Sequence, residues 1–502
     1  MRIAFWLMQD SIRNWSGWIA GFYYIKNCLQ ALSQLPANEQ PNVYAFVPEA
    51  LIDKLVESTN FAEASWLTIV PIAESMLVDR EGIEQLEKLV QEYECDVFFP
   101  AITPPVMVVK SKIIGWIPDY QHKYFPEFFS KEELAYRDRM FAFLAGISDR
   151  IVCSSLAVKA DLQQFYPIAR ERGFVLRFTA EPPASALRGD IQQTLERFDI
   201  DQPYAYLPYQ FWVHKNHKQI FEAWSLLKSR GKNFLLICSG ATNDARDPEH
   251  YERLQAMLRS HDLTNIRVLG MIDRDDQWQL YRGAKMVVQP SLFEGWSTSV
   301  EEAKSLGKPL LLSDIPVHRE QLLSSDGFFQ PHDTPGLADL IEAQWCTLPA
   351  GHDPTAESLA LEACRLRVLA FGRELVQLFK QTLASNREPI AEAILPLYLH
   401  MQQEAEARLQ VIDGLVIQMK QSASSEANMA AHQTAEHQAA ENQSARHETA
   451  EHEAAEFATA EHETAEHETA EFATAEHETA EHPRTGTRIC NWLPSRCKTG
   501  SR

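Results

Sequence analysis

The sequence contains no run of 18 apolar residues, and its beginning, MRIAFWLMQDSIRNW, reaches Asp10 before a signal-peptide core could form. We therefore expect neither a membrane span nor a secretory signal. The eight cysteines are scattered, without a CxxC pair or a Cys/His zinc spacing, as is typical of reduced thiols in the cytoplasm. Basic residues are too few for a general nucleic-acid surface, with Lys+Arg 47 against Asp+Glu 69.

Over the first 385 residues, short apolar runs alternate with helical patterns in two successive series. This alternation predicts two α/β domains, each a parallel sheet with helices on both faces. We place the domains at 1–190 and 200–360, separated by a polar stretch near 191–202, and expect a helix at 361–385 to cross back to the first. The expected strands are 3–7, 43–47, 97–100, 113–117 and 150–153, then 204–207, 234–238, 266–269, 286–289 and 309–312.

The remaining sequence changes character. An apolar stripe in 386–424 predicts a helix or a coiled coil. Residues 425–482 repeat Ala/Glu/His-rich pentapeptides, a composition typical of a solvated low-complexity arm, although self-association through 386–482 is an alternative. The five-residue step winds the histidines around a helix, which disfavours metal binding. The basic tail, 483–502, suits contact with an anionic membrane surface.

The motif with the most candidate functional residues runs from Pro290 to Ala303 and reads PSLFEGWSTSVEEA. We expect a strand before it, a turn at Glu294-Gly295, and a helix that opens near Thr298, with Thr298 and Glu301 forming a capping box. A helix N-terminus after a strand favours an anion such as phosphate. Glu294 and Glu302 would both lie at the edge of one crevice and accept hydrogen bonds from sugar hydroxyls. The alternative is an ordinary capped strand–helix unit with surface glutamates.

Glu294-x7-Glu302 resembles the EX7E signature of retaining GT-B glycosyltransferases of family 4. Three further segments resemble this family in the same order: 116–127 with its Pro-Asp-x-Gln-His run, 208–217, and 269–284. The resemblance covers about residues 1–385. It implies the GT-B fold, in which two Rossmann-like domains face each other across a cleft, the first binding acceptor and the second the nucleotide sugar.

The resemblance also implies roles for individual residues. The catalytic candidates are His122, facing the transferred sugar, Lys215, binding the donor diphosphate, and Glu294, touching donor-sugar hydroxyls. The donor-binding candidates are Glu302 at the ribose, the Ser297 and Thr298 backbone at phosphate oxygens, and Gly21 in the glycine loop after the first strand. A structural histidine is the alternative for His122.

One departure from the family concerns charge. Gln210 stands where many members carry an arginine, so one cation facing the leaving diphosphate is missing or comes from elsewhere. Arg246, at the carboxyl end of a predicted strand, is a weaker candidate for that charge. Asp119 of the Pro-Asp-x-Gln-His segment is another weaker candidate for the site.

The expected reaction moves a hexosyl unit, with retention, from a nucleoside-diphosphate sugar to a saccharide or lipid-linked saccharide, in surface-polysaccharide assembly. The departing phosphate would act as base, and no metal or other cofactor is expected. Asp273-x-Asp275-Asp276 is accordingly interpreted as a loop or helix cap. The enzyme would be cytoplasmic, or peripheral at the inner face of the membrane. The alternatives are a degenerate GT-B scaffold acting through the repeat arm, and a nucleotide-sugar epimerase.

Overall fold

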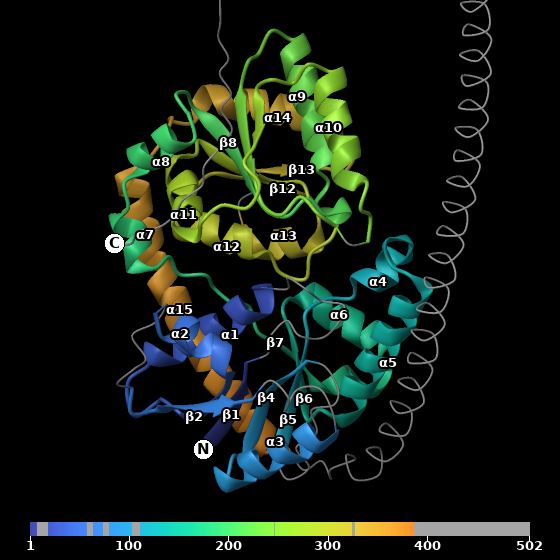
Figure 1. Ribbon diagram of the computed structural model, residues 1–502, viewed down its shortest axis with the longest axis vertical. Helices are drawn as coiled ribbons and strands as arrows, with labels where there is room; N and C mark the ends of the chain where they lie inside the picture. Colours follow the sequence, from blue (N-terminus) through green and yellow to red (C-terminus); the bar gives the residue numbers. More distant parts are fainter. Residues whose placement is uncertain are drawn as a thin grey trace, which may run out of the picture. The chain divides into compact units, whose positions relative to one another are not determined.

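The computed structural model describes residues 1–7, 19–57, 64–73, 80–102, 111–244, 246–323 and 327–385, all within one compact unit, Met1–Met401. The predictions for 386–424, 425–482 and 483–502 lie outside the described residues. Two sheets organise the described chain, one above the other in Figure 1.

The first sheet has the strand order β3-β2-β1-β4-β5-β6-β7, and its paired strands are parallel. Its strands are β1 Arg2–Trp6, β2 Asn42–Pro48, β3 Leu67–Ile72, β4 Val97–Ala101, β5 Lys112–Ile117, β6 Arg150–Cys153 and β7 Gly173–Val175. Its helices are α1 Ile19–Ser33, α2 Glu49–Glu57, α3 Arg80–Glu92, α4 Gln121–Tyr124, η2 Pro126–Phe128, α5 Lys131–Ile147, α6 Leu156–Phe165 and η3 Pro167–Arg172.

The second sheet repeats this topology in the order β10-β9-β8-β11-β12-β13, again parallel. Its strands are β8 Tyr204–Pro208, β9 Leu235–Ser239, β10 Ile266–Val268, β11 Met286–Gln289, β12 Leu310–Ser313 and β13 Phe328–Phe329. The helices are α7 Ala184–Arg188, α8 Ile191–Arg197, η4 Val213–Lys215, α9 His217–Ser229, α10 His250–Ser260, α11 Arg274–Gly283, α12 Thr298–Ser305, α13 Pro316–Gln321, α14 Thr334–Thr347 and α15 Pro354–Leu383.

Alternation along the strands explains why each sheet carries helices on both faces. Ile3 and Phe5 enter one core, whereas Ala4 and Trp6 enter the core on the opposite face. Successive side chains of a strand point to opposite faces, so an apolar run fills two cores. In both sheets the strand order reverses beside the first strand, the place where ligands bind in such folds. The predicted fold class is therefore confirmed, since both sheets have the Rossmann strand order.

Helix α15 joins the two sheets. It begins against α12 and ends in the core of the first sheet, where Phe371, Leu375 and Phe379 are buried with strand residues (Figure 1). Gly372 permits this packing, because a Cβ there would lie 2.6 Å from the carbonyl oxygen of Ala31 in α1. None of the described helices has the length and apolarity needed to cross a membrane.

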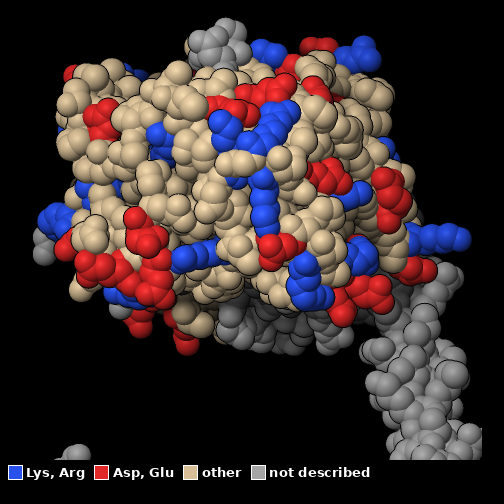
Figure 2. Space-filling model, turned by 90° about the horizontal axis from the view of Figure 1, so that it is seen from above, with Lys and Arg blue, Asp and Glu red and all other residues tan. Residues whose placement is uncertain are grey.

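Charged residues on the described surface are of both signs. Figure 2 shows Lys and Arg interspersed with Asp and Glu in small groups on one face. Residues of opposite charge also form ion pairs: Arg230 contacts Asp339 at 2.7 Å, and Lys232 contacts Glu342 at 2.9 Å.

Candidate active site

The Pro290–Ala303 motif forms the loop after β11 and the first residues of α12. The helix begins at Thr298 as expected, but the predicted capping box is wrong. Ser297 is the capping residue, since its backbone is extended and its hydroxyl accepts from the Val300 N–H at 3.4 Å. Glu301 therefore lies one position too far along the helix to close a box, and pairs with Lys304 at 2.8 Å.

The backbone of Ser297 already has partners in the described structure. Gln321 of α13 accepts a hydrogen bond from the Ser297 N–H at 3.2 Å and donates one to the Ser297 carbonyl at 3.0 Å. The N–H of Ser297 would have to leave Gln321 before it could bind phosphate. The N-terminus of α12 beside it, starting at Thr298, keeps the dipole that favours an anion.

Lys215 and Glu294 are brought together from different strand ends. Lys215 closes η4, the short helix after β8, and its Nζ lies 2.6 Å from Oε1 of Glu294. Gln289 Nε2 donates to the same oxygen at 3.0 Å. Burial by itself would raise the pKa of Glu294, but the charge and hydrogen bond of Lys215, with a hydrogen bond from Ser291, outweigh it and hold the pKa below its ordinary value. Glu294 is therefore a buried, ionised carboxylate with a cation beside it.

Glu302 is also buried, with 3% of its side chain exposed. Its Oε1 forms an ion pair with Nη2 of Arg274, and its Oε2 accepts a hydrogen bond from the Tyr281 hydroxyl at 2.8 Å. Arg274 is the first residue of α11 and was missed in the sequence. No periodicity connects it to Glu302, 28 positions away.

His122 lies in α4, directly after the carboxyl end of β5. It is 2% exposed, its Nε2 lies 3.0 Å from Oδ1 of Asp138, and its ring packs on that of Phe141. Burial lowers the pKa of His122, and the Asp138 carboxylate opposes that shift. No described residue hydrogen-bonds to its Nδ1. Nearby Asp119 orders the segment by accepting from the Gln121 N–H at 2.9 Å.

The Pro-Asp-x-Gln-His segment after β5 contacts the loop between β11 and α12, although the two belong to different sheets. A Cβ on Gly295 would lie 2.1 Å from the carbonyl oxygen of Pro118, so only glycine fits there. Phe293 packs against Tyr124 with ring centroids 5.3 Å apart. The Pro-Asp-x-Gln-His segment and the signature loop therefore form one surface.

The remaining candidates have defined places. Arg246 donates to Gln121 at 2.9 Å and pairs with Asp244 at 2.9 Å, so it lies at the same contact between the sheets. Gln210 follows β8, and its backbone packs against Gly240, where a Cβ would lie 2.8 Å from the Gln210 nitrogen. Gly21 lies inside α1 rather than in the loop before it, since the described helix begins at Ile19.

The acidic triplet after β10 has structural partners. Asp273 occupies the cap position of α11, without a side-chain cap bond, and Asp276 pairs with Arg197 at 2.6 Å. Among the described residues there is no group of three or more His, Cys, Asp or Glu side chains able to hold a metal ion.

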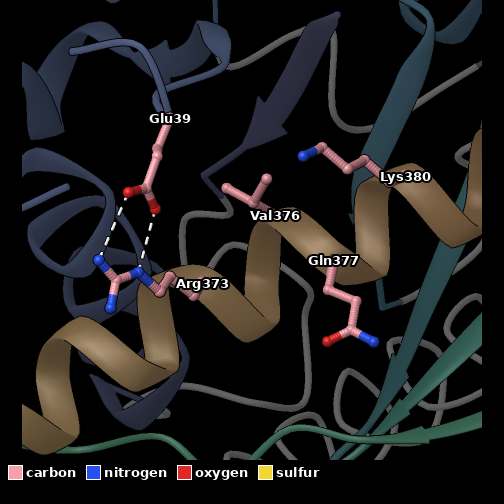
Figure 3. A pocket seen from close by; sticks show the side chains of 5 residues that line it. All are labelled: Glu39, Arg373, Val376, Gln377 and Lys380. Atoms are coloured by element: carbon pink, nitrogen blue, oxygen red, sulfur yellow. Dashed lines mark hydrogen bonds and ion pairs between the residues drawn. The ribbon is translucent and has the colours of Figure 1, made fainter. Parts of the chain in front are cut away.

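A separate cavity of about 240 Å³ lies along α15, away from these motifs. Figure 3 shows Arg373 facing Glu39 across it, with an Nε–Oε2 distance of 3.0 Å. This ion pair neutralises Arg373. The other residues that line the cavity are Val376, Gln377 and Lys380.

Comparison with known proteins finds a family model that matches part of the chain. Residues 197–343 match the family model described as "Glycosyl transferases group 1", and this range contains Lys215, Glu294 and Glu302. The chain is 25% identical over 231 residues to the serotype-specific mannosyltransferase WbdA of Escherichia coli, a match covering 44% of this chain and 27% of WbdA. The chain thus spans about a quarter of that relative.

Solved structures match about three quarters of the chain. A glycosyltransferase from Rickettsia africae ESF-5 superposes with a TM-score of 0.52 at 14% identity, covering 77% of this chain and 99% of that one. Anabaena Alr3699/HepE in complex with UDP and glucose gives a TM-score of 0.54 at 15% identity, covering 76% and 100%. The expected GT-B architecture is confirmed.

Proposed function

We propose that this chain is a glycosyltransferase that moves a hexosyl unit from a nucleoside-diphosphate sugar to a saccharide or lipid-linked saccharide in cell-surface polysaccharide biosynthesis. The proposal rests mainly on the Lys215–Glu294 pair at 2.6 Å, beside the N-terminus of α12, within the segment that matches the group 1 model. The bound UDP and glucose of HepE and the serotype-specific role named for WbdA support the substrate classes.

In the proposed reaction the bond between the sugar's anomeric carbon and the phosphate oxygen breaks, and a bond to the acceptor oxygen forms on the same face. The acceptor's proton passes to the departing phosphate, and we expect the reaction to need no metal or cofactor. Lys215 and the α12 N-terminus stabilise the charge that develops on that phosphate. Glu302 holds ribose hydroxyls, Glu294 holds sugar hydroxyls, and His122 faces the sugar. Gly21, in the first turn of α1, would approach the donor phosphates.

Calorimetric titration of the full chain with UDP, GDP, ADP and dTDP tests the proposal. We expect one nucleotide to bind, and Lys215→Met to weaken it at least tenfold, because a charge-assisted bond to phosphate is lost. Lys218→Met is the matched control, because Lys218 lies three residues further along the chain, in α9, and its side chain is 71% exposed. Binding of none of the four would overturn the proposal.

Turnover is then assayed with the matching nucleotide sugars, mannose first, and with saccharide acceptors. The anomeric configuration of the first product, read by NMR, tests retention. An inverted product would rule out a retaining mechanism.

We further propose that the enzyme acts in the cytoplasm and contacts the inner membrane face through its basic tail, 483–502, and self-associates through 386–482. Flotation with anionic vesicles and sedimentation of chains with and without 386–502 test these two points. Neither affects the catalytic proposal.

A further inference from the structure

The charged groups of the candidate donor site form two matched pairs. Lys215 neutralises Glu294, and Arg274 neutralises Glu302, so the described site has no net charge from these four groups. A nucleoside-diphosphate sugar brings a diphosphate with about two negative charges into this site, where low dielectric strengthens every interaction. Both cations would have to turn toward the diphosphate to offset that charge.

Arg274 is placed to do so. Its guanidinium contacts two aromatic rings, 4.6 Å from the centroid of Trp278 and 5.4 Å from that of Tyr23 in α1. Its side chain is 33% exposed, whereas that of Glu302 is 3% exposed. The arginine therefore meets solvent at the rim of the site, while the carboxylate stays behind it. A planar guanidinium with five N–H groups can keep Gln277, at 2.7 Å, and still bind a phosphate oxygen.

Arg246 is less suited to that task. Two hydrogen bonds, Nε to Oδ1 at 2.9 Å and Nη2 to Oδ2 at 3.1 Å, hold it to Asp244. A third goes to Gln121 of the first domain at 2.9 Å. Its guanidinium is therefore already paired with Asp244 and stabilises the contact between the two sheets.

We propose that Arg274 is a donor-binding residue that binds the diphosphate of the nucleotide sugar and so supplies the cation absent at Gln210. This inference rests on the proposed function. On donor entry the guanidinium exchanges Glu302 for phosphate oxygens, and the freed Oε1 of Glu302 accepts from a ribose hydroxyl. Glu302 keeps its bond from Tyr281 throughout, which holds the carboxylate in place.

The test compares the full chain with Arg274→Gln, Arg274→Lys and the control Arg253→Gln. Arg253 is 54% exposed on α10 and pairs with its acidic neighbours Asp247 and Glu249. Each chain is titrated with the nucleoside diphosphate that the parent binds and with the corresponding nucleoside, which lacks phosphate.

We expect Arg274→Gln to weaken the diphosphate at least tenfold and the nucleoside less than threefold. Arg274→Lys should recover part of the loss, and Arg253→Gln should match the parent. An equal loss for both ligands would show that Arg274 only positions Glu302 and would overturn the inference, as would unchanged diphosphate affinity. A parent chain that binds no nucleotide would overturn the proposed function as well, so the two failures are distinguishable.

Discussion

Glu294 combines burial with an adjacent ammonium, and the two groups depend on each other. In Lys215→Met the carboxylate stays buried without its cation, which costs about 3 kcal/mol of unfolding free energy. In the double variant Lys215→Met/Glu294→Gln no charge remains, so we expect most of that loss to be recovered. Denaturant unfolding of the parent, both single variants and the double variant measures the coupling. Additive losses would contradict a direct interaction.

His318 in α13 is fully buried and bonds through Nδ1 to the Ser313 carbonyl at 2.9 Å. Burial lowers its pKa from 6.5 to about 4. As the pH falls, the unfolded chain therefore takes up the proton first. The stability contribution is complete above pH 6.5 and is lost progressively toward pH 4, by up to about 3 kcal/mol.

The measurement is the unfolding free energy between pH 7 and pH 4 in the parent and in His318→Asn, whose amide can replace the Nδ1 bond. We expect a shallower decline in the variant. His214 and His217 have pKa values lowered by burial too, so some decline persists. Identical slopes would show that His318 does not titrate as described.

The sequence predicts the acidic and basic residues of the site only where they lie in a recognisable motif. Lys215, Glu294 and Glu302 follow strand ends within short runs of known spacing. Arg274 does not, because its pairing with Glu302 depends on how α11 packs beside α12. The cap was misassigned for a similar reason: Ser297 and Thr298 both carry hydroxyls, and only the backbone angles select the first.

At the level of elements, the fit between the two motif loops depends on Gly295. Gly295→Ala would place a methyl group 2.1 Å from the Pro118 carbonyl, so the loops must separate, at about 1–3 kcal/mol. We expect Gly295→Ala to lower the melting temperature of the chain and to reduce its turnover to a greater degree. Gly146→Ala in α5 is the matched control, because outside the backbone of its own helix and its chain neighbours no described atom lies within 4 Å of the added Cβ, and alanine favours a helix there. A fully active Gly295→Ala chain would contradict the fit.

Most strands were predictable, because strands buried on both faces are continuous apolar runs. Three were missed. β3, Leu67–Ile72, lies at a sheet edge with alternating exposure, and β7 and β13 have only three and two residues. Such short or edge strands bury too little to show as an apolar run, and their pairing is decided by the sheet that they join.

On the scale of the whole molecule, Glu320 of α13, beside the second sheet, binds residues that belong to the first. Its carboxylate accepts from the N–H groups of Leu156 and Ala157 at 2.9 and 3.0 Å, and pairs with Arg177 at 2.9 Å. Glu320→Ala removes these partners, so amide exchange at the start of α6 should accelerate about tenfold. Mass-spectrometric exchange measures it, with Glu249→Ala, an exposed residue at the N-cap of α10, as control. Unchanged exchange at α6 would contradict the contact.

The sequence order of the two strand series was enough to predict two parallel sheets. It was not enough to predict contacts such as that of Glu320, which join residues more than 160 positions apart. Nor does it show that α7, ahead of the expected second domain, packs into that domain's core through Ala186.

The course of α15 also bears on how the chain folds during synthesis. One core of the first sheet contains Ile3 and Phe5 at one end of the described chain and Leu375 and Phe379 at the other. At roughly 5–20 residues per second, a ribosome needs about 10–40 s after the last strand of that sheet to deliver α15. During that interval the first domain lacks part of its apolar core, and chaperones have their longest opportunity to bind it.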